Sequence, residues 1–146
     1  MLYCLKCHKW AYKNHHCPIN SLISLKKECR GIADRLFLLG FDVMSAGCFT
    51  HPVQDSIYEH RITIDIEFRR QYLTSILGDL PAGWKWWTET ITADRTPLSV
   101  LAYSEVYVWL GFETIADRIT QIVTGFEEYL DRIDNEAFGA IMLLAN

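Results

Sequence analysis

The chain has 146 residues, of which 50% are hydrophobic and 22% are charged, and its formal net charge is −4. This composition is typical of a globular protein and excludes a wholly disordered or collagen-like chain. The length fits one domain, whose core is large enough to fold without disulfides.

Cellular location is inferred from apolar runs and cysteines. The longest apolar run, AIMLLA at residues 140–145, is far shorter than the roughly 20 residues that cross a bilayer. The N-terminus has no uninterrupted apolar stretch of signal-peptide length. Five cysteines, an odd number that includes a C-x-x-C pair, indicate metal or redox chemistry rather than a disulfide framework. We therefore expect a cytoplasmic protein without a membrane partner.

The densest motif is CLKCHKWAYKNHHC at residues 4–17. Zinc prefers thiolate and imidazole ligands in a tetrahedron, and a C-x-x-C turn directs two sulfurs, here from Cys4 and Cys7, at one ion. Cys17 supplies a third thiolate. For the fourth ligand we prefer His15, because residues two apart in an extended backbone face the same side. His16 is the alternative if the backbone turns before the following proline.

This segment resembles the short zinc knuckles of zinc-ribbon and treble-clef proteins, over about the first twenty residues. Their second half commonly reads C-P-x-C or C-x-x-C, whereas this chain has Cys17-Pro18-Ile19-Asn20, with asparagine at the last position. The main alternative is a redox pair, which usually opens a helix in a βαβ setting that residues 4–7 lack. Cys29 and Cys48 are interpreted as small buried hydrophobic residues.

A site with four protein ligands leaves no position for water or substrate. We therefore predict a structural Zn²⁺ cofactor. Residues 1–20 are predicted to form the zinc-binding loop, and residues 21–146 a single α+β domain that packs with this loop as one unit.

The remaining elements follow from hydrophobic periodicity. Residues 21–39 predict an amphipathic helix that ends at Gly40, and residues 70–78 a short helix. Residues 41–50 and 60–69 predict two strands; the second is the clearer, because Ile62, Ile64, Ile66 and Phe68 alternate with polar residues.

The second half predicts another hairpin, from residues 84–91 and 97–110, that is rich in aromatic and β-branched side chains. Residues 113–133 predict a helix of about five turns, and residues 136–145 an apolar terminal helix. Because the strands come in pairs, the expected fold is α+β: an antiparallel sheet of about four strands in two hairpins, packed by helices, with an N-terminal zinc-knuckle-like loop.

Two surfaces are candidates for partner binding. Trp86 and Trp87 are adjacent in a predicted strand and must point to opposite faces, so one of them is a candidate contact residue. The long helix carries an acidic face with Glu127, Glu128 and Asp131, which suits a basic partner. Together with the lack of a recognisable catalytic motif, these surfaces favour a non-enzymatic zinc-stabilised regulatory protein that docks to a protein partner.

Two alternatives remain open. The basic N-terminal region makes a nucleic-acid-binding protein the first of them. The phosphate contacts would come from the following side chains: Lys6, Lys9, Lys13, Lys26, Lys27 and Arg30. The second alternative is a metal-dependent enzyme that uses Asp65 and Glu67, which share one strand face. For these two carboxylates we prefer the simpler account, a solvated strand face on which Arg61 and Arg69 are their partners.

Overall fold

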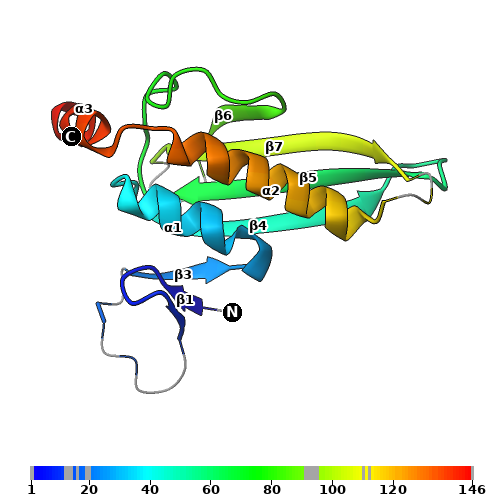
Figure 1. The fold of residues 1–146 in the computed structure, drawn as a ribbon, viewed down its shortest axis with the longest axis horizontal. Helices are drawn as coiled ribbons and strands as arrows, with labels where there is room; N and C mark the ends of the chain where they lie inside the picture. The colour runs from blue at the N-terminus through cyan, green and yellow to red at the C-terminus, as the bar shows by residue number, and fades with distance from the viewer. Residues whose placement is uncertain are drawn as a thin grey trace.

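The computed structural model describes residues 2–11, 15, 17–18, 21–90, 96–109, 111 and 113–145. The protein is α+β, with a mixed seven-stranded sheet of order β2-β1-β3-β4-β5-β7-β6 (Figure 1). The strands are β1 (Leu2–Cys4), β2 (Lys9–Trp10), β3 (Leu22–Leu25), β4 (Val43–Pro52), β5 (Glu59–Phe68), β6 (Trp84–Glu89) and β7 (Leu98–Val108). The helices are η2, a 3-10 helix (Lys27–Cys29), α1 (Arg30–Leu38), α2 (Ile115–Asp131) and α3 (Asn135–Ala145).

The central strands confirm the predicted hairpins. β4 pairs with β5, β5 with β7 and β7 with β6, all antiparallel. Ile62, Ile64, Ile66 and Phe68 of β5 are fully buried, whereas the three residues between them are half-buried. The alternation in β5 therefore marks the face of the sheet that carries the core.

The prediction of about four strands is wrong, because β1, β2 and β3 add to the sheet. Residues 21–39 were expected to form one helix, but they form β3, η2 and α1. β3 pairs antiparallel with β1 and parallel with β4, and Ile23 and Leu25 point into the core while Ser24 is exposed. Pairing with two distant strands outweighs the helical spacing of the leucines.

Residues 70–78 were also expected to be helical, and this prediction is wrong as well. The segment forms turns between β5 and β6. Tyr72, Ile76 and Leu77 are nevertheless buried, and the backbone N–H of Tyr72 donates to Ser99 Oγ at 2.7 Å. Burial of apolar side chains is thus achieved here without regular secondary structure.

Helices α1 and α2 lie side by side over one face of the sheet (Figure 1). Arg35 of α1 forms ion pairs with Glu127 at 3.2 Å and with Asp131 at 2.9 Å, both from α2. A Cβ at Gly31 would lie 2.5 Å from a carboxylate oxygen of Glu127. Glycine therefore leaves room for the Glu127 carboxylate against α1.

Helix α3 lies at one end of the sheet (Figure 1). It buries Phe138 and Met142, and it leaves Ile141, Leu143 and Leu144 exposed. Within the described residues, no helix is both long and apolar enough to span a membrane.

Candidate metal centre and open sheet face

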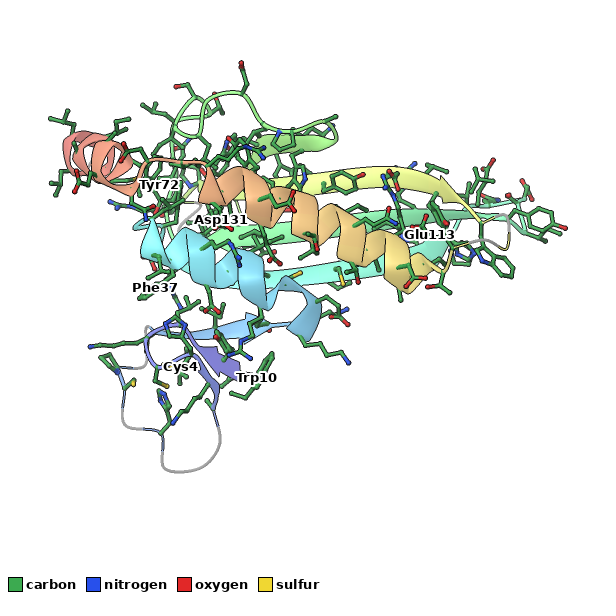
Figure 2. The ribbon with its side chains drawn as sticks, in the orientation of Figure 1. Cys4, Trp10, Phe37, Tyr72, Glu113 and Asp131 are labelled. Carbon is green, nitrogen blue, oxygen red and sulfur yellow. The ribbon has the colours of Figure 1, made fainter. Side chains whose placement is uncertain are left out.

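The N-terminal loop brings four predicted ligands together. The ligand atoms of Cys4, Cys7, His15 and Cys17 all lie within 4.8 Å of one another, with Cys4 buried and the others half-buried. Figure 2 shows Cys4 in this loop, next to β3. His16, the alternative to His15, lies outside the described residues.

The backbone is shaped for this cluster. β1 and β2 pair antiparallel, and the turn between them carries Cys7 and His8. His8 has a φ of 59°, in the left-handed region, and its N–H donates to the carbonyl of Cys4 at 2.9 Å. The N–H of Cys7 donates to Cys4 Sγ at 3.4 Å. This tight turn places the two sulfurs of the C-x-x-C pair on one side.

The distances suit tetrahedral coordination. With metal–sulfur and metal–nitrogen bonds of about 2.3 and 2.05 Å, a tetrahedron separates sulfur from nitrogen by about 3.6 Å. The observed separation between Cys7 Sγ and His15 Nε2 is 3.6 Å. Cys7 and His15 therefore have the separation that a four-coordinate ion requires, and the other ligand atoms lie within 4.8 Å.

Two thiols of the cluster, those of Cys4 and Cys17, have shifted pKa values. Burial of Cys4 opposes ionisation, but hydrogen bonds with Ser21 and with Cys7 and Lys6 outweigh burial and lower the pKa of Cys4 to about 6. The pKa of Cys17 is raised by desolvation and by its thiol neighbours, Cys4 and Cys7. The cluster thus holds one thiolate readily at neutral pH, whereas further negative charge calls for a cation among the sulfurs.

A hydrogen-bond network fastens the metal loop to α1. The Tyr3 hydroxyl, which is buried, donates to the Asp34 carboxylate at 2.9 Å, and His8 Nδ1 lies 3.0 Å from the same carboxylate. Arg30 donates to the Tyr3 hydroxyl at 3.1 Å and to the carbonyl of His8 at 3.0 Å. These hydrogen bonds therefore fix the position of the loop relative to α1. In metal sites, hydrogen-bond partners outside the ligand set commonly orient the ligands in this way.

The two adjacent tryptophans point to opposite faces of the sheet, as expected. Trp86 lies on the helix side, where its ring packs against Phe41 and Phe68, with centroids at 6.3 and 5.5 Å. Its indole Nε1 is buried and has no hydrogen-bond partner among the described residues. Trp87 lies on the other face and is 50% exposed. Of the pair, Trp87 is the one available to a partner.

The predicted acidic surface on α2 is partly used inside the molecule. Glu127 and Asp131 both pair with Arg35, and Asp131 is labelled in Figure 2 where α2 ends over α1. Glu128 is exposed. Glu127 and Asp131 therefore contribute to the contact between the two helices, whereas Glu128 faces solvent.

The sheet face opposite the helices contains a groove of about 410 Å³. Small residues of β3 and β4 lie at its centre: Ser24, Ser45 and Gly47. Phe49 and Lys26 also line the groove. The Lys26 ammonium lies 4.0 Å from the centroid of the Phe49 ring and donates a hydrogen bond to the carbonyl of Cys48. A Cβ at Gly47 would approach the Phe49 ring to 3.2 Å, so glycine preserves this space.

Asp65 and Glu67 line the same groove from β5. The arginines expected to neutralise them are engaged elsewhere: Arg61 donates to Ser104 Oγ at 2.9 Å, and Arg69 pairs with Asp42 at 3.0 Å. Desolvation and the negative charge of Glu67 raise the pKa of Asp65. Within the described residues neither carboxylate takes part in an ion pair, although Ser45 donates to Glu67 at 3.2 Å.

The basic side chains proposed for nucleic acid are divided between two environments. Lys6, Lys9 and Lys27 are exposed, whereas Lys26 and Arg30 make the internal contacts described above. Lys13 lies outside the described residues. The described lysines are therefore only partly available to a phosphate backbone.

Sequence reasoning missed the groove and the network around Asp34. The alternation of Ile23, Ser24 and Leu25 could have indicated β3, and with it one wall of the groove. The contact between Tyr3 and Asp34 joins distant segments, and no local pattern indicates it. Comparison with protein-family models, with curated proteins and with solved structures found no match for this chain.

Proposed function

We propose that this protein is a non-enzymatic, zinc-stabilised docking module of the cytoplasm whose open sheet face binds another protein. The observation that carries the proposal is the groove on the face opposite the helices, in which two carboxylates lack a cationic partner among the described residues. The metal centre contributes stability and takes no part in the docking.

Zinc is the ion that best suits the donor set. Thiolates with one imidazole favour Zn²⁺ over hard cations such as Mg²⁺ and Ca²⁺, which prefer oxygen. The candidate ligands are Cys4, Cys7, His15 and Cys17. Because four protein ligands complete a tetrahedron, the ion has a structural role: it joins the β1–β2 turn to the segment that leads into β3.

A direct test of the metal is its content and its effect on folding. Purified protein should contain about one zinc per chain, and Cys7→Ser should lose it. Lys9→Ala, an exposed change in the same loop, is the matched control and should retain zinc. A folded wild-type chain without bound metal, or a Cys7→Ser variant with full zinc content, contradicts this part of the proposal.

The open face has the width of a helix. Three strand spacings of about 4.8 Å separate β4 from β6, or about 14 Å, and an α-helix with its side chains measures about 10–12 Å. Exposed aromatic rings border this span, Phe49 on β4 and Trp87 on β6. Between them, Gly47 and Ala102 lie opposite Asp65 in the register, and Ser45 and Val100 lie opposite Glu67.

The charges indicate what such a helix would carry. Asp65 and Glu67 form no ion pair with a described residue, and burial, followed by the negative charge of Glu67, raises the pKa of Asp65. An arginine or lysine of the partner, placed between them, would relieve this repulsion, while apolar side chains would pack on Phe49 and Trp87. The proposed partner is therefore a protein helix with a basic and an apolar side.

Affinity capture with matched variants tests the docking. Wild-type protein and the variants Trp87→Ala and Asp65→Asn/Glu67→Gln are compared as baits by quantitative mass spectrometry. A genuine partner should be depleted at least tenfold with both variants and retained with Tyr58→Ala, which removes an aromatic side chain of similar exposure outside this face. Purified partner should then show the same order of Kd values. Equal binding by all baits refutes the proposed face.

Binding assays with nucleic acid at increasing salt, using matched variants, distinguish the nucleic-acid alternative from protein docking. Binding to nucleic acid should weaken steeply with salt, because each neutralised phosphate releases counterions. It should also respond to Lys6→Ala and Lys9→Ala rather than to Trp87→Ala. That pattern would replace the protein-docking proposal.

A further inference from the structure

Two cysteines outside the metal centre lie together in the core. Cys29 ends η2 and caps the start of α1, and Cys48 lies in β4 on the face covered by the helices. Cys29 is fully buried and Cys48 is 8% exposed. The sequence alone suggests two unrelated small hydrophobic residues, but η2 packs against β4, both residues belong to one core cluster, and their side chains interact through a hydrogen bond.

Several contacts hold η2 against β4 at this point. The N–H of Lys26 donates to the carbonyl of Ala46 at 3.1 Å, and its ammonium donates to the carbonyl of Cys48 at 3.0 Å. The thiol of Cys48 donates to Glu28 Oε2 at 3.9 Å, and Glu28 directly precedes Cys29. The backbone of both cysteines is thus fixed relative to each other by bonds on either side.

The two thiols also differ in acidity. A hydrogen bond with Cys48 and burial raise the pKa of Cys29, whereas the hydrogen bond with Cys29 lowers the pKa of Cys48. Glu28 opposes ionisation of Cys48 and Lys26 favours it. Cys48 is therefore the thiol that ionises first, and it is also the more exposed of the two.

We propose that Cys29 and Cys48 form an intramolecular disulfide when the protein meets hydrogen peroxide, as an oxidation site separate from the metal centre. Peroxide is the suitable oxidant because the slight exposure of Cys48 admits a small molecule and excludes a bulky disulfide such as oxidised glutathione.

The chemistry balances in two steps. The Cys48 thiolate attacks one peroxide oxygen, the O–O bond breaks, and Cys48 becomes a sulfenic acid while hydroxide leaves and takes up the proton released from the Cys48 thiol. Cys29 then attacks the sulfenic sulfur, the S–O bond breaks, and the second hydroxide leaves with the proton of Cys29. Two thiols are oxidised and one peroxide is reduced to two waters.

Trypsin separates the two cysteines, which makes the product easy to identify. Cleavage after Lys27 and Arg30 releases residues 28–30, and cleavage after Arg35 and Arg61 releases residues 36–61. Zinc-loaded protein is treated with hydrogen peroxide, alkylated in denaturant and digested without reductant. The expected product is these two peptides joined, with the mass of the pair less two hydrogens, and dithiothreitol should separate them.

The controls distinguish a folded pair from random coupling. The joined peptide should be the main crosslink of folded protein and a minor one when urea-unfolded protein is oxidised in the same way. Cys29→Ala and Cys48→Ala should each abolish it. The proposal is overturned if both thiols remain alkylatable after peroxide, if Cys48 proceeds to sulfinic acid while Cys29 stays a thiol, or if either residue couples instead to Cys4, Cys7 or Cys17.

Discussion

The network between the metal loop and α1 makes the sharpest stability prediction. In Asp34→Ala, the buried Tyr3 hydroxyl loses the carboxylate to which it donates at 2.9 Å. A hydrogen bond to a charged group contributes about 1.5–3 kcal/mol, and a buried donor without an acceptor carries its full desolvation cost. The contacts of His8 and Arg30 with Asp34 involve side chains that are 45% and 47% exposed, so they add little to stability.

We therefore expect Asp34→Ala to lower the free energy of unfolding by about 2–3 kcal/mol. The measurement is urea unfolding of zinc-saturated protein, followed by tryptophan fluorescence. Asp34→Asn retains an acceptor oxygen and should lose clearly less. In a double-mutant cycle, Asp34→Ala and Tyr3→Phe should be coupled by at least about 1 kcal/mol. A loss below about 0.5 kcal/mol for Asp34→Ala, or strict additivity with Tyr3→Phe, would refute the assigned role of this hydrogen bond.

Two further predictions concern the turn before β6 and an ion pair. Gly83→Ala should lower the free energy of unfolding by at least about 3 kcal/mol, because φ is +89° and the new Cβ would lie 2.4 Å from the Tyr103 ring. Gly78→Ala is the control: φ is +70° there, no atom lies within 4 Å of the new Cβ, and the expected loss is only about 1–2 kcal/mol. Equal losses in thermal unfolding would exclude the clash as the cause. Hydrogen bonding from Arg118 lowers the pKa of Glu105 in the folded state. The stability that this interaction contributes is therefore present above the unfolded pKa of a glutamate, about 4.3, and is lost as the pH falls through the folded pKa of Glu105. Unfolding midpoints from pH 7 to 3 should therefore fall less steeply in Glu105→Gln than in wild type; identical slopes would contradict the assignment.

The parts of the fold that were predicted correctly have local signals. The alternation in β5 and the helical spacing in α2 each repeat over many residues, so a single stretch of sequence specifies both the element and its buried face. The metal cluster belongs to the same class, because Cys4, Cys7, His15 and Cys17 lie within one short segment. Ligand chemistry and residue spacing were sufficient to place His15 with the three cysteines, and the choice between His15 and His16 stays a prediction.

The parts that were missed depend on distant partners. The leucines at residues 22 and 25 have helical spacing, but β3 forms because β1 and β4 offer backbone hydrogen bonds on both sides. The groove has the same origin, since Ser24, Ser45 and Glu67 meet only when three strands are aligned. Strand pairing over long separations is a property of the whole chain, and a window of sequence does not contain it.

The position of the metal loop in the sheet has a consequence for solubility. β2, the outermost strand on that side, has two residues, so it offers few free backbone groups to a neighbouring molecule. If the metal centre came apart and β1 left the sheet, the edge of β3 would be exposed next to the apolar residues Ile23 and Leu25. A metal ion bound by the four ligands would then protect the molecule against self-association into aggregates as well as against unfolding.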